Sequence, residues 1–166
     1  MELEYRYKTE PLPHQREAFD LSKDAEAFAL VMDQGTGKTK VTLDTVAYNY
    51  SKGTIEAAVI LVPSGLQENW LTKEVGKHLP DHIPVQTFAW KETPSTKKAK
   101  AAMDALFEPS PGERLRMVCI HYEGTLTDAG KKFLWKIQRY FKTLVAIDQA
   151  QFIKSPGAKR TRVARN

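Results

Sequence analysis

The stretch AFALVMDQGTGKTK, residues 27–40, decides the fold class of this chain. Its first six residues, AFALVM (27–32), form an apolar run that predicts a short buried strand. After the glycine-rich part, Val41, Thr45 and Tyr48 recur at the spacing of one helix face. We therefore expect a strand, a tight loop and a helix in succession.

The loop GTGKT (35–39) has the composition of a phosphate-binding site. Glycines let backbone N–H groups approach a phosphate closely, and the N-terminus of the following helix favours negative charge. In such a loop, Lys38 would reach the β- and γ-phosphates of a nucleotide, and the Thr39 hydroxyl would ligate Mg²⁺. The full pattern G-x-x-x-x-G-K-[ST] requires a glycine where this chain has Met32, so a chance match in a nonbinding loop is the alternative. The nucleotide contacts predicted from the loop are Gly35, Thr36, Gly37, Lys38 and Thr39.

A second magnesium ligand is predicted near the end of the chain. The stretch TLVAIDQAQFIKS (143–155) begins as a buried strand, and Asp148 stands directly after it. A P-loop needs a carboxylate at the end of another buried strand to hold the metal ion. Asp148 is the candidate for this role, and an ordinary turn or helix-capping aspartate is the alternative.

Strands alternate with helices along the chain. Residues 66–75 and 128–141 have the apolar spacing of amphipathic helices. This alternation predicts an α/β fold with a mostly parallel sheet and helices on both faces. Ligands bind such sheets at the carboxyl ends of the strands, where the polar motifs of this sequence also fall. Besides 27–32, strands are predicted at residues 57–63, 84–90, 115–122 and 143–148.

The composition is that of one globular domain. The 166 residues are enough for a single core, and 42% of them are hydrophobic and 27% charged. No apolar run is long enough to span a membrane, and the N-terminal residues lack the apolar core of a signal peptide. Cys119 is the only cysteine, which excludes an internal disulfide and a cysteine-built zinc site. We therefore expect an intracellular protein without a membrane partner.

The net charge of +5 is concentrated at the C-terminus. Residues 154–166 carry five basic side chains and no acidic one, which equals the excess of 25 basic over 20 acidic residues. Concentrated positive charge favours a polyanion such as nucleic acid, whereas a solvated terminus is the alternative. The residues assigned to nucleic-acid binding on this basis are Lys154, Lys159, Arg160 and Arg162.

Five segments together resemble a known family. They are LPHQ (12–15), MDQGTGKT (32–39), LVPSGLQENWLTKE (61–74), CIHYEGTL (119–126) and LVAIDQAQFIKS (144–155). In this order they resemble the motifs of superfamily-2 helicases. The tryptophan of QENW and the IK after the aspartate look most like the Swi/Snf-like, chromatin-remodeller-type DNA translocases and their bacterial and viral relatives. The resemblance implies one N-terminal RecA-like lobe over residues 1–166, with a P-loop and with ATP and Mg²⁺ as cofactors.

The resemblance also implies roles for residues outside the loop. Gln15 would contact the adenine, with a surface helix glutamine as the alternative. Pro63, Ser64 and Tyr122 would lie near the backbone of nucleic acid, which in this family is double-stranded DNA. Alternatively, Pro63 merely ends a strand and Tyr122 is a core aromatic, and we expect Trp70 to be a core residue. A protein of this kind would act in the cytoplasm or at the nucleoid.

Gln149 stands where the family carries a glutamate that orients and helps to deprotonate the attacking water. Glutamine has the same shape but carries no charge and cannot usefully accept the proton. The resemblance therefore implies a lobe that binds Mg-ATP and hydrolyses it slowly or not at all. It further implies a second RecA-like lobe in a longer native chain, because the sequence ends soon after the DExx-type motif.

Two other functions stay open at this point. One is a naturally short nucleotide- or DNA-binding module that has lost catalysis and acts through a partner. The other is a P-loop kinase for a small molecule, which would share residues 35–39 but would need neither LPHQ nor the basic terminus.

Overall fold

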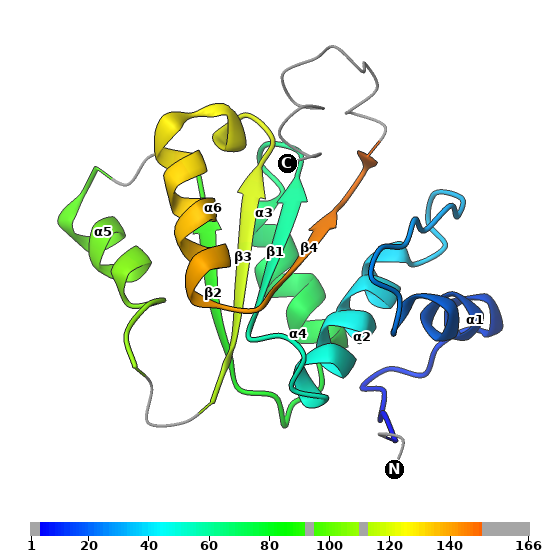
Figure 1. The fold of residues 1–166 in the computed structure, drawn as a ribbon. Coiled ribbons are helices and arrows are strands. Elements are labelled where there is room, and N and C mark those ends of the chain that lie inside the picture. Colours follow the sequence, from blue (N-terminus) through cyan, green and yellow to red (C-terminus); the bar gives the residue numbers. More distant parts are fainter. Residues whose placement is uncertain (1–3, 92–94, 110–112, 151–166) are drawn as a thin grey trace.

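Parallel strands form the sheet at the centre of the structure (Figure 1). The structure is a computed structural model and describes residues 4–91, 95–109 and 113–150. Within this part of the chain, four strands lie in the order β2-β3-β1-β4, and each neighbouring pair runs parallel. Their bounds are Ala57–Val62 for β1, Val85–Trp90 for β2, Leu115–His121 for β3 and Thr143–Ile147 for β4.

Strand β1 is buried along its whole length. Its register pairs Ala57 with Arg116 of β3 on one side and with Thr143 of β4 on the other. Successive side chains of a strand point to opposite faces of the sheet, so Ile60 belongs to the core on one face and Val59 to the core on the other. This is why β1 is apolar at every position: it is a parallel strand covered on both faces.

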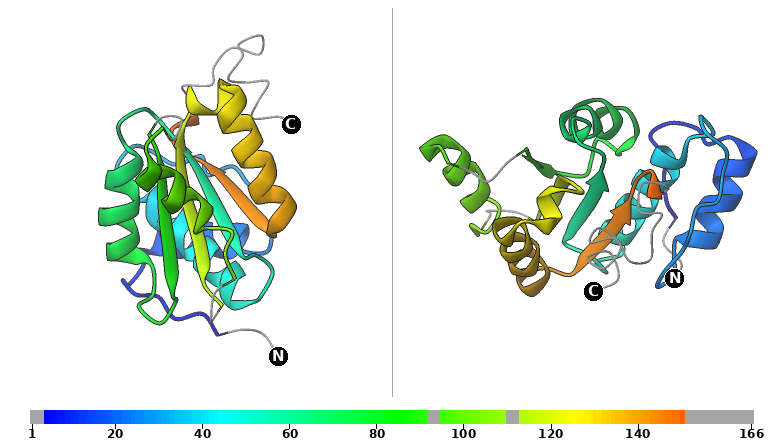
Figure 2. Two further views of the ribbon diagram at one scale, coloured as in Figure 1. Left: turned by 90° about the vertical axis from the view of Figure 1, so that its left-hand side faces the viewer. Right: turned by 90° about the horizontal axis from the view of Figure 1, so that it is seen from above.

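Helix α2 and the helical segment 67–78 cover one face of the sheet. The helix α2 spans Lys38–Ser51, and the segment consists of α3 (Gln67–Asn69), a π-helical turn (Trp70–Glu74) and α4 (Val75–His78). Viewed from above, the segment 67–78 and α6 lie on opposite sides of the strands (Figure 2). The side chains that pack against β1 and β3 from these helices include Leu43, Val46, Trp70, Leu71 and Val75.

Helix α6, Asp128–Tyr140, covers the opposite face. Thr127 caps this helix, because its hydroxyl accepts a backbone N–H of the first turn at 3.0 Å. Phe133 and Ile137, one turn apart, are both buried against the sheet. The ring of Phe133 stacks on Trp90 at the end of β2, with the two centroids 4.8 Å apart. The sequence prediction of a helix here is confirmed.

Helix α1, Pro13–Ser22, packs on α2 rather than on the sheet (Figure 1). Phe19 of α1 packs against Val41 and Tyr48 of α2. Tyr5, from the segment before α1, stacks on Phe19 with the ring centroids 5.2 Å apart. The spacing of Val41 and Tyr48 therefore predicted a buried helix face correctly, and its partner is another helix.

The predicted α/β fold, with a parallel sheet and helices on both faces, is confirmed. The four strands predicted after residue 40 are all present. Helix α5, Lys97–Asp104, and a 3₁₀ turn, Gly124–Leu126, complete the elements of the described residues. None of the helices in this described part is both long and apolar enough to cross a membrane.

The predicted strand at residues 27–32 is wrong. The segment is irregular, and the exposed fractions of Phe28 and Val31 are 49% and 93%. The backbone N–H of Val31 bonds locally to the carbonyl of Ala29 at 3.1 Å. A strand needs a partner for its N–H and C=O groups, and a short apolar run alone does not specify one. Among the described strands, β4 lies at an edge of the sheet.

Candidate functional site

The N-terminus of α2 and the residues after β4 enclose a cavity of about 90 Å³. Lys38 and Thr39 line it from α2, and Asp148 and Gln149 line it from the turn after β4. Trp70 contributes to the lining from the π-helical turn. The four residues that the sequence assigns to the phosphates, the metal ion and the attacking water therefore meet at one cavity.

Gly37 enters α2 in a backbone conformation that only glycine adopts without strain. Its φ of +89° is left-handed, and Gly35 two residues earlier has a φ of +80°. A Cβ atom on Gly37 would lie 2.3 Å from Nε2 of Gln15, so a side chain at position 37 would displace the amide of Gln15. The backbone conformation thus requires glycine at position 37, and the contact with the Gln15 side chain favours it.

The ammonium group of Lys38 lies against the backbone of its own loop. Its Nζ donates to the carbonyl of Met32 at 2.9 Å and to that of Asp33 at 2.8 Å. Carbonyl oxygens carry only partial charge, so a phosphate would be the stronger partner for this cation. Lys38 therefore supplies a positive charge at the cavity that its present partners do not neutralise.

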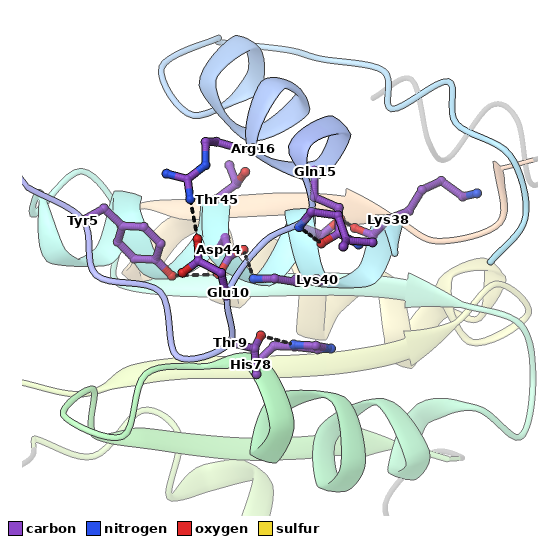
Figure 3. A network of polar contacts seen from close by, with 12 residues as sticks. Tyr5, Thr9, Glu10, Gln15, Arg16, Lys38, Lys40, Asp44, Thr45 and His78 are labelled. Carbon is purple, nitrogen blue, oxygen red and sulfur yellow. Dashed lines mark hydrogen bonds and ion pairs between the residues drawn. The ribbon is translucent and has the colours of Figure 1, made fainter. Parts of the chain in front are cut away.

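The side chain of Gln15 binds the loop from α1 (Figure 3). Its Nε2 donates to the carbonyl of Thr36 at 2.9 Å, and its Oε1 accepts the backbone N–H of Leu12 at 3.0 Å. The Nε2 of His14 also lies 3.0 Å from the Thr36 carbonyl. Gln15 is buried, so the alternative of a surface glutamine is wrong. Its contact with adenine stays a prediction.

Asp148 is held by two aromatic side chains. Its backbone N–H donates to the carbonyl of Leu61 at 2.9 Å, which extends the hydrogen bonding between β1 and β4 one residue beyond the end of β4. The indole Nε1 of Trp70 donates to the Asp148 Oδ2 at 3.0 Å, and the Tyr122 hydroxyl donates to the Asp148 backbone carbonyl. Trp70 is 3% exposed, which confirms the predicted core position. The sequence analysis missed the contact of Trp70 with Asp148. A buried indole N–H needs a hydrogen-bond acceptor, and this need was the signal that could have pointed to such a contact.

Gln149 has a left-handed backbone with a φ of +54°. It is the only residue other than glycine with a positive φ in the described part of the chain. Such a conformation is uncommon for glutamine and concentrates at functional sites in proteins. The turn therefore holds the residue after Asp148 in a strained conformation at the edge of the cavity, and no feature of the sequence indicated this.

The residues assigned to nucleic acid have different surroundings. Pro63 and Ser64 follow β1, at the same end of the sheet as Asp148, and Ser64 is exposed. Tyr122 follows β3 and is 3% exposed, so its ring lies in the core. Contact with DNA stays a prediction for these residues. The basic residues Lys154, Lys159, Arg160 and Arg162 lie outside the described residues.

A buried ion pair on α2 ties the N-terminal segment to this helix (Figure 3). The Nζ of Lys40 lies 2.7 Å from Oδ2 of Asp44, and the hydroxyl of Tyr5 donates to Oδ1 of Asp44 at 3.0 Å. Lys40 and Asp44 are both buried. Burial raises the pKa of Asp44 and outweighs the opposing influence of Lys40 and Tyr5. All three groups must be in place together, because the loss of one leaves a buried polar group unpaired.

The same N-terminal segment also contacts α4. The hydroxyl of Thr9 lies 2.8 Å from Nδ1 of His78, and Lys8 donates to a backbone carbonyl of α4 at 2.7 Å. Burial lowers the pKa of His78, and neighbouring lysine charges act in the same direction. The segment bridges α2 and α4 and leads directly into α1, so it fixes the position of Gln15 relative to the glycine-rich loop.

Comparisons with known proteins identify the fold. No protein-family model and no curated protein gives a significant match to the chain. A solved structure that matches is the "Sulfolobus solfataricus SWI2/SNF2 ATPase core in complex with dsDNA", with a TM-score of 0.69 and 20% sequence identity. The fold of this chain is similar to that of part of this SWI2/SNF2 ATPase core. The likeness confirms the predicted RecA-like fold and, at the level of the fold, the resemblance to Swi/Snf-like proteins.

The SWI2/SNF2 likeness covers 99% of this chain and 31% of the Sulfolobus chain. It therefore includes both sides of the cavity, the loop before α2 and the turn after β4. The chain spans less than a third of the length of that ATPase core, so activities of the complete core are not transferred by the likeness.

Proposed function

We propose that the cavity binds the phosphates of Mg-ATP and that this chain is an ATP-binding lobe of a helicase-like, ATP-dependent DNA translocase. The observation that carries the proposal is the meeting of a cation, a hydroxyl and a carboxylate, from Lys38, Thr39 and Asp148, at one cavity. P-loop proteins use these groups for the phosphates and for the metal ion. The fold of a SWI2/SNF2 ATPase core supports the same assignment.

The volume of the cavity suits phosphate groups rather than a whole nucleotide. About 90 Å³ is far below the roughly 300–1,000 Å³ of most ligand pockets, so the base and the ribose would lie outside it. A second groove of about 240 Å³ lies next to the loop, between α1 and residues 28–32. His14 and Phe28 line this groove and offer aromatic surfaces for an adenine, and Gln15 is the neighbour of His14 on α1.

The chemistry of the lining residues defines their roles. ATP supplies the phosphoanhydride bond whose hydrolysis drives motors of this class. Lys38 would exchange its two loop carbonyls for the β- and γ-phosphates, and Thr39 with Asp148 would hold Mg²⁺. The hydrogen bond from the indole N–H of Trp70 would hold the carboxylate of Asp148 in place at the cavity. Gln149 would orient a water molecule without accepting its proton, so hydrolysis would be slower by about 10²–10⁴-fold.

Double-stranded DNA is the proposed partner of the lobe. The matching ATPase core is described as a complex with dsDNA, and Pro63 and Ser64 lie at the sheet end that carries the cavity. The basic residues from Lys154 onward follow Asp148 closely in sequence. We further propose that a second RecA-like lobe completes the motor, since this chain matches 31% of the Sulfolobus core. Such a motor would act inside the cell, on chromosomal or other DNA.

The glutamine at position 149 favours a second candidate function. A module that binds nucleotide or DNA without hydrolysis, and that acts through a partner protein, would need Lys38 and Thr39 but no carboxylate at position 149. The two candidates differ in whether a glutamate at this position restores turnover.

Mg-ATP binding measured by calorimetry tests the proposed function. The chain is expected to bind Mg-ATP, and Lys38→Ala is expected to abolish binding because the phosphates lose their cation. Lys52→Ala is the matched control. Lys52 lies at the C-terminal end of α2, at the opposite end from Lys38, and forms a surface ion pair with Asp24. Unchanged affinity in Lys38→Ala would remove the P-loop assignment.

Hydrolysis then separates the two candidates. Gln149→Glu should raise steady-state ATP hydrolysis in the presence of duplex DNA once a second lobe is supplied. No gain in that complete context would favour the module that acts through a partner.

A further inference from the structure

A groove of about 360 Å³ lies between α5 and α6, on the sheet face opposite to α2, and is called the α5/α6 groove below. Both walls have the spacing i, i+3, i+4, i+7 of a single helix face. One wall consists of Lys100, Met103 and Asp104 of α5 and Phe107 of the turn after it. The other wall consists of Ala129, Lys132, Phe133 and Lys136 of α6. The groove shares no residue with the cavity at the P-loop.

Aromatic rings form much of the lining of the α5/α6 groove. Trp90, which is 2% exposed, stacks on Phe133, and Phe107 meets Phe133 edge to face with the centroids 6.3 Å apart. Met103 packs against the same core cluster. The volume of the groove is at the low end of the usual range for ligand pockets, which is enough for one large apolar side chain.

The rim of the groove is positively charged from both sides. Lys100 lies on one wall, and Lys132 and Lys136 lie on the other. The Nζ of Lys136 lies 3.9 Å from the centroid of Phe107, so its charge lies over an aromatic ring of the opposite wall. Among the described residues, no carboxylate forms an ion pair with these three lysines. Asp104 is the one acidic side chain that the described residues contribute to the lining.

We propose that the α5/α6 groove docks an acidic polypeptide segment, which inserts one large apolar side chain between the two helices. Carboxylates on either side of that apolar residue would pair with lysines on both walls. Asp104 would accept a backbone N–H of the segment. A nucleic-acid duplex suits the groove less well, because its bases are stacked inside the double helix and present no apolar side chain to the lining. This docking function is separate from the proposed nucleotide site.

A labelled peptide tests the proposal directly. The probe is a fluorescein-labelled peptide with a central Phe flanked by Glu on both sides, and its binding to the full chain is followed by fluorescence anisotropy. Lys132→Glu should weaken binding by about tenfold or more, since a paired charge is reversed at the rim. Lys131→Glu is the matched control, because this substitution makes the same change in net charge. Lys131 is exposed on the same helix and lies outside the groove. It should change the affinity by less than about twofold.

A second pair of measurements tests insertion of the apolar side chain. Ala129→Phe fills the groove and should abolish binding, while thermal unfolding shows whether the variant is folded. Probe peptides with Phe replaced by Ser, or with Glu replaced by Gln, should each bind at least about tenfold more weakly.

Three results would overturn the proposal. The first is equal weakening by Lys131→Glu and Lys132→Glu, which would mean diffuse attraction to a basic helix. The second is tight binding by folded Ala129→Phe. The third is duplex DNA that binds the chain and loses affinity in Lys132→Glu while the peptide does not, which would make the groove a nucleic-acid surface.

Discussion

The indole Nε1 of Trp70 donates to the carboxylate of Asp148 at 3.0 Å, across 78 positions of sequence. Trp70 begins the π-helical turn and is packed into the core, whereas Asp148 follows the edge strand β4. A core residue and a predicted metal ligand are therefore joined by one hydrogen bond. π-Helical turns often occur at functional sites, and here the turn places the indole beside the cavity.

Trp70→Phe should weaken both the fold and the metal-dependent binding of nucleotide. Phenylalanine keeps an aromatic ring in the core but removes the donor to Asp148, so the free energy of unfolding should fall by roughly 1–3 kcal/mol. If Asp148 holds Mg²⁺ as proposed, the Mg²⁺ dependence of ATP binding should shift to higher metal concentration. Urea unfolding and calorimetry at several Mg²⁺ concentrations measure the two effects.

The control for this prediction is Trp135→Phe. Trp135 is 62% exposed on α6 and is not among the residues that line the cavity, so its replacement should stay within about 0.5 kcal/mol of the parent. Equal effects of the two substitutions would mean that the bond between Trp70 and Asp148 contributes nothing specific.

Gln149→Gly should stabilise the chain. The φ of +54° at this position is strained for glutamine but not for glycine, and relief of that strain is worth about 1 kcal/mol. Gln149→Val should do the opposite, because a β-branched residue tolerates a left-handed backbone least. Chemical denaturation of the two variants should therefore move in opposite directions from the parent, and a shift in the same direction would contradict the role of the backbone.

The sequence correctly predicted elements whose apolar pattern indicates how many of their faces are buried. The continuous apolar run of β1 requires cover on both faces, and the stripe of Phe133 and Ile137 requires one apolar neighbour, so both were predicted correctly. The run at residues 27–32 is apolar throughout, like β1, but does not pair with the sheet. Whether an apolar run becomes a strand depends on a distant partner, which composition does not encode.

The residues of the candidate site could be proposed from the sequence, but the contacts that hold them could not. Motif spacing pointed to Lys38, Thr39 and Asp148. The N-terminus of α2 and the carboxyl end of β4 meet at one cavity, which brings these residues together. The bonds from Trp70 and from Gln15 to the site span long sequence separations and depend on side-chain packing. They needed the structure.

His78 should make the stability of the chain sensitive to acid. Its pKa lies below the ordinary 6.5 because of burial first and neighbouring lysines second, although Glu74 is 3.8 Å from its Nε2. A base with a lowered pKa binds fewer protons when folded than when unfolded, so stability is lost as the pH falls below 6.5. His78→Gln cannot protonate and should show a smaller decline in urea stability between about pH 7 and pH 5.

His82→Gln is the control for the acid sensitivity, since His82 is exposed four residues away. This variant should keep the pH dependence of the parent. A decline that is identical in all three proteins would show that other groups, and not His78, cause the loss of stability in acid.

Gly37→Ala should uncouple α1 from the glycine-rich loop. The φ of +89° costs alanine roughly 1–2 kcal/mol, and the new Cβ would also meet the Gln15 amide at 2.3 Å. Gly35→Ala has a similar φ of +80° but no atom within 4 Å of its Cβ, so it suffers the backbone strain alone. The difference between the two variants in urea unfolding therefore measures the contact with Gln15. Gly37→Ala should be the less stable, and adding Gln15→Ala should restore part of that difference; equal stability of the two glycine variants would mean that α1 does not hold the loop through this contact.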